Sequence, residues 1–328
     1  MKIIRALTLG LLAGFASNST FAEPTKLIFS HVVGPNTPKG KMAVMFKDIV
    51  EEKLPGRFEV VIYEKASLMS DVEAVDAIAE GRIHFAAPAL SKFTNYTSKL
   101  KVFDLPFMFP DMESVTSFQE GFMGRLLLTS MSDDNILGLG YLQNGLKQLT
   151  ATTHFSEPGD LQGRRFRIID TDVLKDQFLA LGAEPVPIPW PQTFDAIRAG
   201  QVDGQENTWS NIYSSEFYRY QPHMMASNHG VLGYMLITSQ SFWTGLKQEE
   251  RRLLSYALDV ALQYGNAVAT AKSINDKEEL RTMRGIELLE PTKEQLATWR
   301  QVMVPIWQKY ESAIGKSIVD AARKHSGG

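Results

Sequence analysis

An element order that occurs twice along the chain places the strongest constraint on its fold. Residues 26–33 are rich in β-branched and apolar side chains and indicate a strand. The pattern then predicts a helix, a strand, a helix and a strand over residues 38–54, 57–63, 71–80 and 83–87. The second half repeats this order, with strands at residues 165–169, 185–188 and 202–205 and helices at 172–181 and up to residue 199. Such alternation predicts an open parallel sheet in each half.

Local signals agree with this reading. Thr37 is a suitable N-cap before Pro38, and Ser70 with Glu73 forms a capping-box pattern at the start of the second helix. Residues 76–83 also match residues 195–202 in sequence, at an offset of 119 residues. Both copies run from the end of a helix into the next strand, which favours two domains of the same kind.

Two further apolar stretches are expected to connect these domains. Residues 136–142 read as a strand that carries two glycines, and residues 231–237 are again strand-like, so both are expected to act as hinge strands. Long helices follow at 248–284 and from Thr292, where Gln295 completes another capping box, and they are expected to pack on both domains. We expect α/β domain I at residues 23–143, α/β domain II at 144–235 and hinge-crossing and C-terminal helices at 236–328.

The first 22 residues have the character of an export signal. Lys2 and Arg5 precede an apolar run at residues 6–15, and the small residues around Ala22 suit signal peptidase. The run is about half the length of roughly 20 apolar residues that a membrane anchor needs. We therefore expect cleavage after Ala22 and a soluble mature protein.

Composition excludes several kinds of chemistry. The chain has no cysteine, so disulfides, thiolate catalysis and cysteine-ligated metal centres are excluded. Loss of the export signal leaves a net charge near −5, which does not suit a nucleic-acid partner. Hydrolase, metalloprotease, phosphate-loop and calcium-loop motifs do not occur, and the six histidines lie far apart in sequence. We expect neither a catalytic centre nor a cofactor or metal.

Basic residues beside strand ends are the candidates for a binding site, because open α/β sheets bind ligands there. Lys39 lies in the first turn of a helix, where free N–H groups and the helix dipole favour an anion. Lys92 follows the third strand, and Lys147 follows the first hinge strand. Alternation along the strand at 165–169 places Arg165 and Arg167 on one face. An acidic protein with these cations gathered at strand ends suits a small anion.

The motifs resemble those of the TRAP-transporter solute receptors over essentially the whole mature chain. The shared segments are Ser70-Asp71, Glu80-Gly81, residues 103–109, residues 161–168 and residues 202–207. The four-carbon dicarboxylate branch (DctP type) is most similar, through residues 37–40, 91–93, 207–213 and 228–231. The resemblance implies a two-domain periplasmic-binding-protein clamshell with helices on both faces of open, mostly parallel sheets. It also implies a monomer in the periplasm that binds succinate, fumarate or malate, delivers it to the TRAP permease membrane subunits and catalyses no reaction.

The same resemblance assigns roles to individual residues. Arg167 corresponds to the arginine that pairs with the ligand carboxylate, which a planar guanidinium can bind through two parallel hydrogen bonds. Asn207 is an amide donor to the ligand, and Lys147 stands where many members have a second basic residue. Lys39 and Lys92 correspond to extra cations of the dicarboxylate branch. The remaining candidates are Asn211, Tyr234 and Trp209, the last of which suits core packing equally well.

Three alternatives remain open at this stage. The same fold could bind a monocarboxylate such as a keto acid or sugar acid. The chain could also be a ligand-sensing partner of a membrane sensor kinase, or a periplasmic hydrolase. Gene neighbourhood separates transport from sensing, and turnover assays test for hydrolysis.

Overall fold

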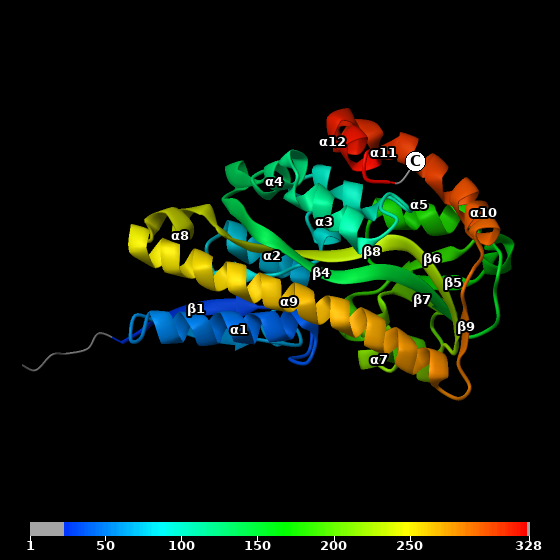
Figure 1. Ribbon diagram of the computed structural model, residues 1–328, viewed down its shortest axis with the longest axis horizontal. Helices are drawn as coiled ribbons and strands as arrows, with labels where there is room; N and C mark the ends of the chain where they lie inside the picture. The colour runs from blue at the N-terminus through cyan, green and yellow to red at the C-terminus, as the bar shows by residue number, and fades with distance from the viewer. Residues whose placement is uncertain (1–22, 327–328) are drawn as a thin grey trace, which may run out of the picture.

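The computed structural model describes residues 23–326, so the expected export signal at residues 1–22 lies outside the described residues. Figure 1 shows an elongated molecule in which one long twisted sheet is covered by helices on both faces. The first half contains β1 (Thr25–Ser30), α1 (Pro38–Lys53), β2 (Phe58–Tyr63), α2 (Asp71–Ala79), β3 (Phe85–Ala86), α3 (Met112–Glu120) and α4 (Phe122–Leu128).

The long strand β4 (Ile136–Ala151) leads into the second half, and β8 (His223–Ser239) leads back. Between them lie β5 (Arg165–Ile168), α5 (Asp172–Ala180), β6 (Glu184–Pro187), α6 (Trp190–Arg198), β7 (Gly204–Asn207) and α7 (Trp209–Ser214). The chain ends with α8 (Gln240–Gly245), α9 (Gln248–Thr282), β9 (Glu287–Leu289), α10 (Lys293–Met303), α11 (Trp307–Ile314) and α12 (Lys316–Arg323).

The strands form one sheet in the order β2-β1-β3-β8-β4-β7-β5-β6, and β9 pairs with β8. β1 is parallel to β2 and β3, and β5 is parallel to β6 and β7, whereas β4 and β8 are antiparallel to each other. These two parallel parts joined by antiparallel strands confirm the predicted fold class. The expected domain boundaries at residues 143 and 235 fall inside β4 and β8, which run through both halves.

Hydrogen bonds between β4 and β8 are interrupted at three irregularities. One of them, between Gln143 and Gly145, places Gly145 at a φ of +127°, where a residue with a Cβ would be strained. Near the first irregularity, a Cβ at Gly140 would lie 2.5 Å from Leu262 Cδ1 of α9. The glycines of this strand therefore permit a bulge and a close helix contact.

Helix starts follow the predicted caps. The Thr37 side chain accepts a hydrogen bond from the backbone N–H of Gly40, and the expected capping boxes form at Ser70 and Thr292. The helical region after Thr292 is not continuous, because Pro305 lacks an N–H group and Gly315 adopts a φ of +103°. The short strand β9 was not predicted.

The C-terminal helices pack on both halves, as expected. α9 runs along the sheet and contacts α1 of the first half and α7 of the second (Figure 1). On the other face, Trp307 Nε1 donates to the carbonyl of Pro106 at 2.9 Å, and the Tyr310 hydroxyl donates to Asp176 at 2.6 Å. Helix α11 thus forms a hydrogen bond with one residue of each half.

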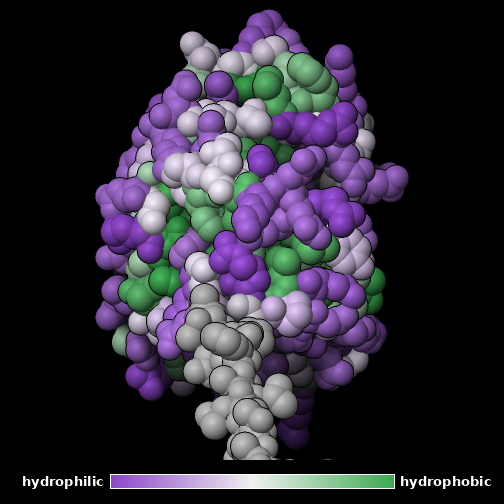
Figure 2. Space-filling view, turned by 90° about the vertical axis from the view of Figure 1, so that its left-hand side faces the viewer, coloured by the Kyte–Doolittle hydropathy of each residue, from purple (hydrophilic) through white to green (hydrophobic). Residues whose placement is uncertain are grey.

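The surface at the end of the molecule from which β1 begins is mainly hydrophilic (Figure 2). Hydrophobic residues appear there in several separate places rather than as one continuous area. Among residues 23–326, no helix combines the length and the apolar character that a membrane crossing requires.

Candidate functional site

A cavity of about 50 Å³ lies between the two halves of the molecule. It is lined by residues of both halves and of β8: Val32, Val33, Lys39, Asp71, Ala89, Lys92, Arg167, Ile169, Trp190, Asn207, Asn211, Leu232 and Tyr234. Six of the eight residues predicted from the sequence are among them. The structure thus brings Arg167, Asn207, Asn211, Lys39, Lys92 and Tyr234 together around one space.

Arg167 occupies the centre of the second-half wall. It lies on β5 between two parallel neighbours, and only 2 % of its surface is exposed. Its Nε and Nη2 both donate to the carbonyl oxygen of Ile188, at 3.0 and 2.8 Å. This carbonyl fixes the guanidinium and leaves the edge formed by Nη1 and Nη2 for a ligand carboxylate. Burial lowers the pKa of Arg167 to about 10, so the side chain remains cationic at neutral pH.

Asn207 and Asn211 form an amide pair beside the arginine. Asn207 ends β7, and Thr208 caps α7, so the turn from strand to helix places both amides at the carboxyl edge of the sheet. The Asn207 Oδ1 accepts hydrogen bonds from Asn211 Nδ2 at 2.7 Å and from the Thr208 N–H at 3.1 Å. Its oxygen is thereby engaged, and the Asn207 NH₂ group is the part that remains to donate to an anion.

Lys39 brings a buried cation from the first half. Its side chain is 1 % exposed, and its Nζ has no hydrogen-bond acceptor among the described residues. The Nζ lies 3.7 Å from the centroid of the Tyr234 ring. Burial lowers the pKa of Lys39, and the Asp71 carboxylate opposes this shift. An anion in the cavity would supply the missing partner.

The turn before Lys39 depends on a glycine. A Cβ at Gly40 would lie 2.4 Å from the carbonyl oxygen of Gly34, so the preceding turn can close on the helix only because Gly40 has no side chain. Thr37 caps the same turn through its hydroxyl. The sequence Thr-Pro-Lys-Gly therefore fixes both the start of α1 and the place of its lysine.

Lys92 and Asp71 complete the charged part of the cavity. Lys92 ends the short 3₁₀ segment Leu90–Lys92 after β3, and burial lowers its pKa while Asp71 opposes the shift. Asp71 lies at the start of α2 and accepts a hydrogen bond from the Ala89 N–H at 3.3 Å. Asp71 is not among the site residues predicted from the sequence, where Ser70-Asp71 indicates a helix start and a segment shared with the family. The lining thus carries three cations and one carboxylate.

Lys147 lies outside this cavity. It is 2 % exposed, and its Nζ donates to Glu206 Oε1 at 2.7 Å. The second oxygen of Glu206 is 2.9 Å from His229 Nε2. Burial by itself would raise the pKa of Glu206, but attraction by Lys147 and hydrogen bonding with His229 lower it to about 2. Glu206 therefore neutralises Lys147, and the structure does not present this lysine to a ligand.

Trp209 also lies away from the cavity. It is 4 % exposed and belongs to an apolar cluster with Ile212, Met224, Ala226 and Leu280. This is the core-packing alternative. A different tryptophan, Trp190 at the start of α6, lines the cavity and was not predicted, because its sequence surroundings are those of an ordinary helix start.

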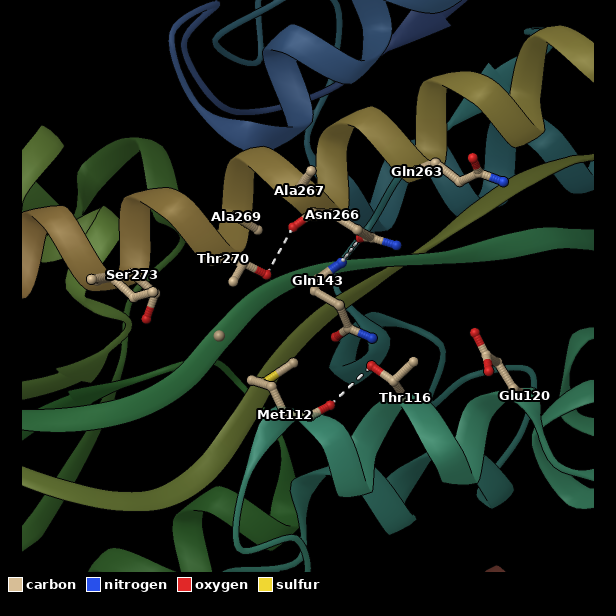
Figure 3. Close-up of a pocket in the computed structure, with 12 residues that line it drawn as sticks. Met112, Thr116, Glu120, Gln143, Gln263, Asn266, Ala267, Ala269, Thr270 and Ser273 are labelled. Atoms are coloured by element: carbon tan, nitrogen blue, oxygen red, sulfur yellow. Dashed lines mark hydrogen bonds between the residues drawn. The ribbon is translucent and has the colours of Figure 1, made fainter.

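A second cavity of about 440 Å³ lies between α3, β4 and α9 (Figure 3). Amide, hydroxyl, small and apolar side chains line it, and the Gln143 side chain points away from Asn266 toward α3, where it donates to Gln119. The backbone N–H of Gln143 donates to Asn266 Oδ1 at 2.8 Å. Among its lining residues the only ionisable side chain is the carboxylate of Glu120. Although larger, this cavity does not suit an anion.

Comparison with known proteins gives consistent matches over the chain. Residues 29–313 match the family described as bacterial extracellular solute-binding protein, family 7 (DctP). The C4-dicarboxylate-binding periplasmic protein DctP of Shewanella loihica is 44% identical over 321 residues, which cover 98% of this chain and 95% of that protein.

Solved structures agree with this match. A TRAP periplasmic solute-binding protein from Shewanella oneidensis with bound succinate has a TM-score of 0.90 and 44% identity, covering 92% of this chain and 99% of that one. Another from Pseudomonas aeruginosa with bound L-malate has a TM-score of 0.84 and 40% identity, covering 88% and 100%.

Proposed function

The chain belongs to family 7 of the bacterial extracellular solute-binding proteins, and on this premise we propose that it captures a four-carbon dicarboxylate in the cavity between its two halves. The relatives that are 40% or more identical include structures with succinate and with L-malate bound. The observation that carries the proposal is the charge of the cavity lining. Lys39, Lys92 and Arg167 face a single Asp71, which leaves an excess of two positive charges for a dianion.

The cations are divided between the two walls. Arg167 and Asn207 come from the second half, whereas Lys39 and Lys92 come from the first. A diacid can place one carboxylate on the Arg167 edge and the other near the lysines, which bridges the halves. A buried ammonium that is left unpaired costs several kcal/mol, so the lysine end disfavours ligands with only one charge.

This division supports a binding protein that closes around its ligand rather than an enzyme. Contacts from both halves exist together only when the halves approach each other, so the ligand stabilises the closed form. We propose that the closed form delivers the diacid to the membrane subunits of a TRAP permease. The proposal places the mature protein in the periplasm after removal of residues 1–22, with no catalysed reaction.

The test is a titration of the purified mature protein with matched acids. Succinate, fumarate and malate should each bind at least about a hundredfold more tightly than butyrate, because butyrate leaves the lysines without a partner. Galactonate serves as the larger acid. Calorimetry gives the dissociation constants, and comparable binding of butyrate and succinate would contradict the dicarboxylate assignment.

A further inference from the structure

Three side chains that are distant in sequence converge near the strand β9. His154 follows β4, His223 begins β8 and Glu287 begins β9. The Nδ1 of His154 lies 2.7 Å from Glu287 Oε1, and the Nδ1 of His223 lies 2.6 Å from Glu287 Oε2. One potential ligand atom from each residue lies within 4.8 Å of the others. None of the three lines the dicarboxylate cavity.

Backbone pairing holds this group in place. His223 is opposite Glu287 in the parallel β8–β9 pair and opposite Ala151 in the antiparallel β4–β8 pair. The Glu287 N–H donates to the carbonyl of Pro222 at 2.9 Å. The guanidinium of Arg164 donates to the carbonyl oxygen of His154 at 3.0 Å. The three residues are therefore positioned by sheet register and by a fixed turn, although their side chains are partly exposed.

We propose that His154, His223 and Glu287 form a binding site for one divalent transition-metal ion of the zinc class. Two imidazole nitrogens and one carboxylate oxygen are ligands that Zn²⁺ accepts, with water in the remaining position. Such a set does not suit Ca²⁺ or Mg²⁺, which take oxygen ligands.

The side chains have room to adopt coordination geometry. Ligand atoms at about 2.0–2.1 Å from Zn²⁺ lie roughly 3.3 Å from each other in a tetrahedral site. The present spacing reaches this value by small rotations, which the exposed fractions of 58 % for His154 and 51 % for Glu287 allow. A bound ion would link β8, β9 and the segment after β4, and would stabilise the folded chain by mass action.

The experiment uses mature protein without a histidine tag, treated with a chelator and then dialysed. Calorimetric titration with ZnCl₂ should give one ion per chain. The variants His154→Gln and His223→Gln should each weaken Zn²⁺ binding by at least about tenfold, since even indirect supports of metal ligands contribute that much. His325→Gln, a partly exposed histidine near α12, is the matched control and should bind Zn²⁺ as the wild type does.

Two results would overturn the site. One is the absence of Zn²⁺ binding by the wild type, and the other is equal binding by the double variant His154→Gln/His223→Gln. Thermal unfolding without metal verifies that each variant is folded. Neither this measurement nor the Zn²⁺ titration depends on dicarboxylate binding. The melting temperature of the wild type should rise with Zn²⁺, and that of the double variant should not.

Discussion

The Nζ of Lys39 lies 3.7 Å from the centroid of the Tyr234 ring and makes a cation–π contact with its face. Lys39 belongs to the first helix, and Tyr234 belongs to a strand that joins the two halves. A cation over an aromatic ring gains roughly 0.5–2 kcal/mol. This does not offset desolvation of a fully buried ammonium, which agrees with the lowered pKa of Lys39. An anion in the cavity would stabilise the charged form of Lys39.

Replacement of Lys39 by methionine should separate stability from binding. Lys39→Met removes a desolvated charge but keeps a similar volume, so the ligand-free protein should unfold at an equal or higher temperature. Succinate binding should weaken by about 2–5 kcal/mol, the range for loss of one partner of a buried charge pair. Thermal unfolding without ligand and calorimetry with succinate measure the two effects.

Lys53→Met is the matched control, since Lys53 lies on the same helix and is exposed to solvent. It should change neither quantity appreciably. Lys39→Met should also weaken the binding of succinate more than the binding of butyrate, because only the diacid has a second carboxylate for the lysine end. An equal loss for both acids would place the second carboxylate elsewhere.

The geometry of Arg167 predicts that its charge alone is insufficient. Two of its nitrogens are held by the Ile188 carbonyl, which leaves the remaining edge for the proposed ligand carboxylate. An ammonium cannot make both sets of contacts, so Arg167→Lys should lose much of the succinate affinity although the charge is conserved. Arg167→Ala should lose about 2–5 kcal/mol. Calorimetry on both variants provides the test. Wild-type affinity in Arg167→Lys would show that the ligand does not use two parallel hydrogen bonds from the guanidinium.

The fold could be predicted from the sequence because its signals are local. Caps at Thr37, Ser70 and Thr292 and the alternation of strands and helices each depend on residues within one element. The repeat is also visible in the structure, where Gly81 and Gly200 end equivalent helices at φ values of +70° and +66°. The breaks within the C-terminal helical region were not predicted, because the apolar pattern continues past Pro305 and Gly315, where the backbone leaves the α-helix.

The site could be predicted only in part, because its chemistry depends on pairing across the fold. Lys39 and Lys147 look alike in sequence, as lysines near strand or helix ends. The structure distinguishes them, since Glu206 neutralises Lys147 while Lys39 has no acceptor among the described residues. The convergence of His154 with His223 follows from strand pairing between β4 and β8, which residue spacing does not reveal.

Closure around the ligand should be visible as a change in size. The lysines and the arginine of the cavity belong to different halves, which β4 and β8 connect along the chain. Small-angle scattering should give a smaller radius of gyration with saturating succinate than without it. Arg167→Ala at the same succinate concentration is the control that should stay extended. An identical profile for the wild type with and without succinate would exclude closure by hinge rotation.

The buried pair of Lys147 and Glu206 should contribute to stability and not to ligand contact. Both side chains are almost fully buried, at 2 % and 1 % exposed. Loss of one partner leaves a buried charge unpaired, so Glu206→Gln should lower the free energy of unfolding by about 3–5 kcal/mol. The double variant Lys147→Met/Glu206→Gln should recover part of this loss. Urea unfolding measures both, and a double variant as unstable as the sum of the single changes would show that the two charges do not interact.

The same carboxylate predicts how stability depends on acid. The pKa of Glu206 is about 2 in the folded protein, below the value of about 4.3 for an ordinary glutamate. The unfolded chain therefore binds the proton first, and the stabilisation from this group is complete above about pH 4.3 and is lost as the pH falls toward about 2.

Urea unfolding at about pH 5 and at about pH 3 should show a drop in the free energy of unfolding that is smaller in Glu206→Gln than in the wild type. Glu52→Gln, at an exposed position paired only with Lys53, should keep the wild-type drop, because such a surface pair contributes at most about 1 kcal/mol. If Glu206→Gln and the wild type lost the same free energy between the two pH values, protonation of Glu206 would not account for the acid sensitivity.

In that case the stabilising charge would have to be sought among the other buried carboxyl groups, of which Asp104 is the nearest in the sequence to the cavity residue Lys92. Burial raises the pKa of Asp104, the opposite direction to Glu206, so its protonation would leave the folded state no less stable in acid. Asp104 is therefore excluded as the source of the acid loss.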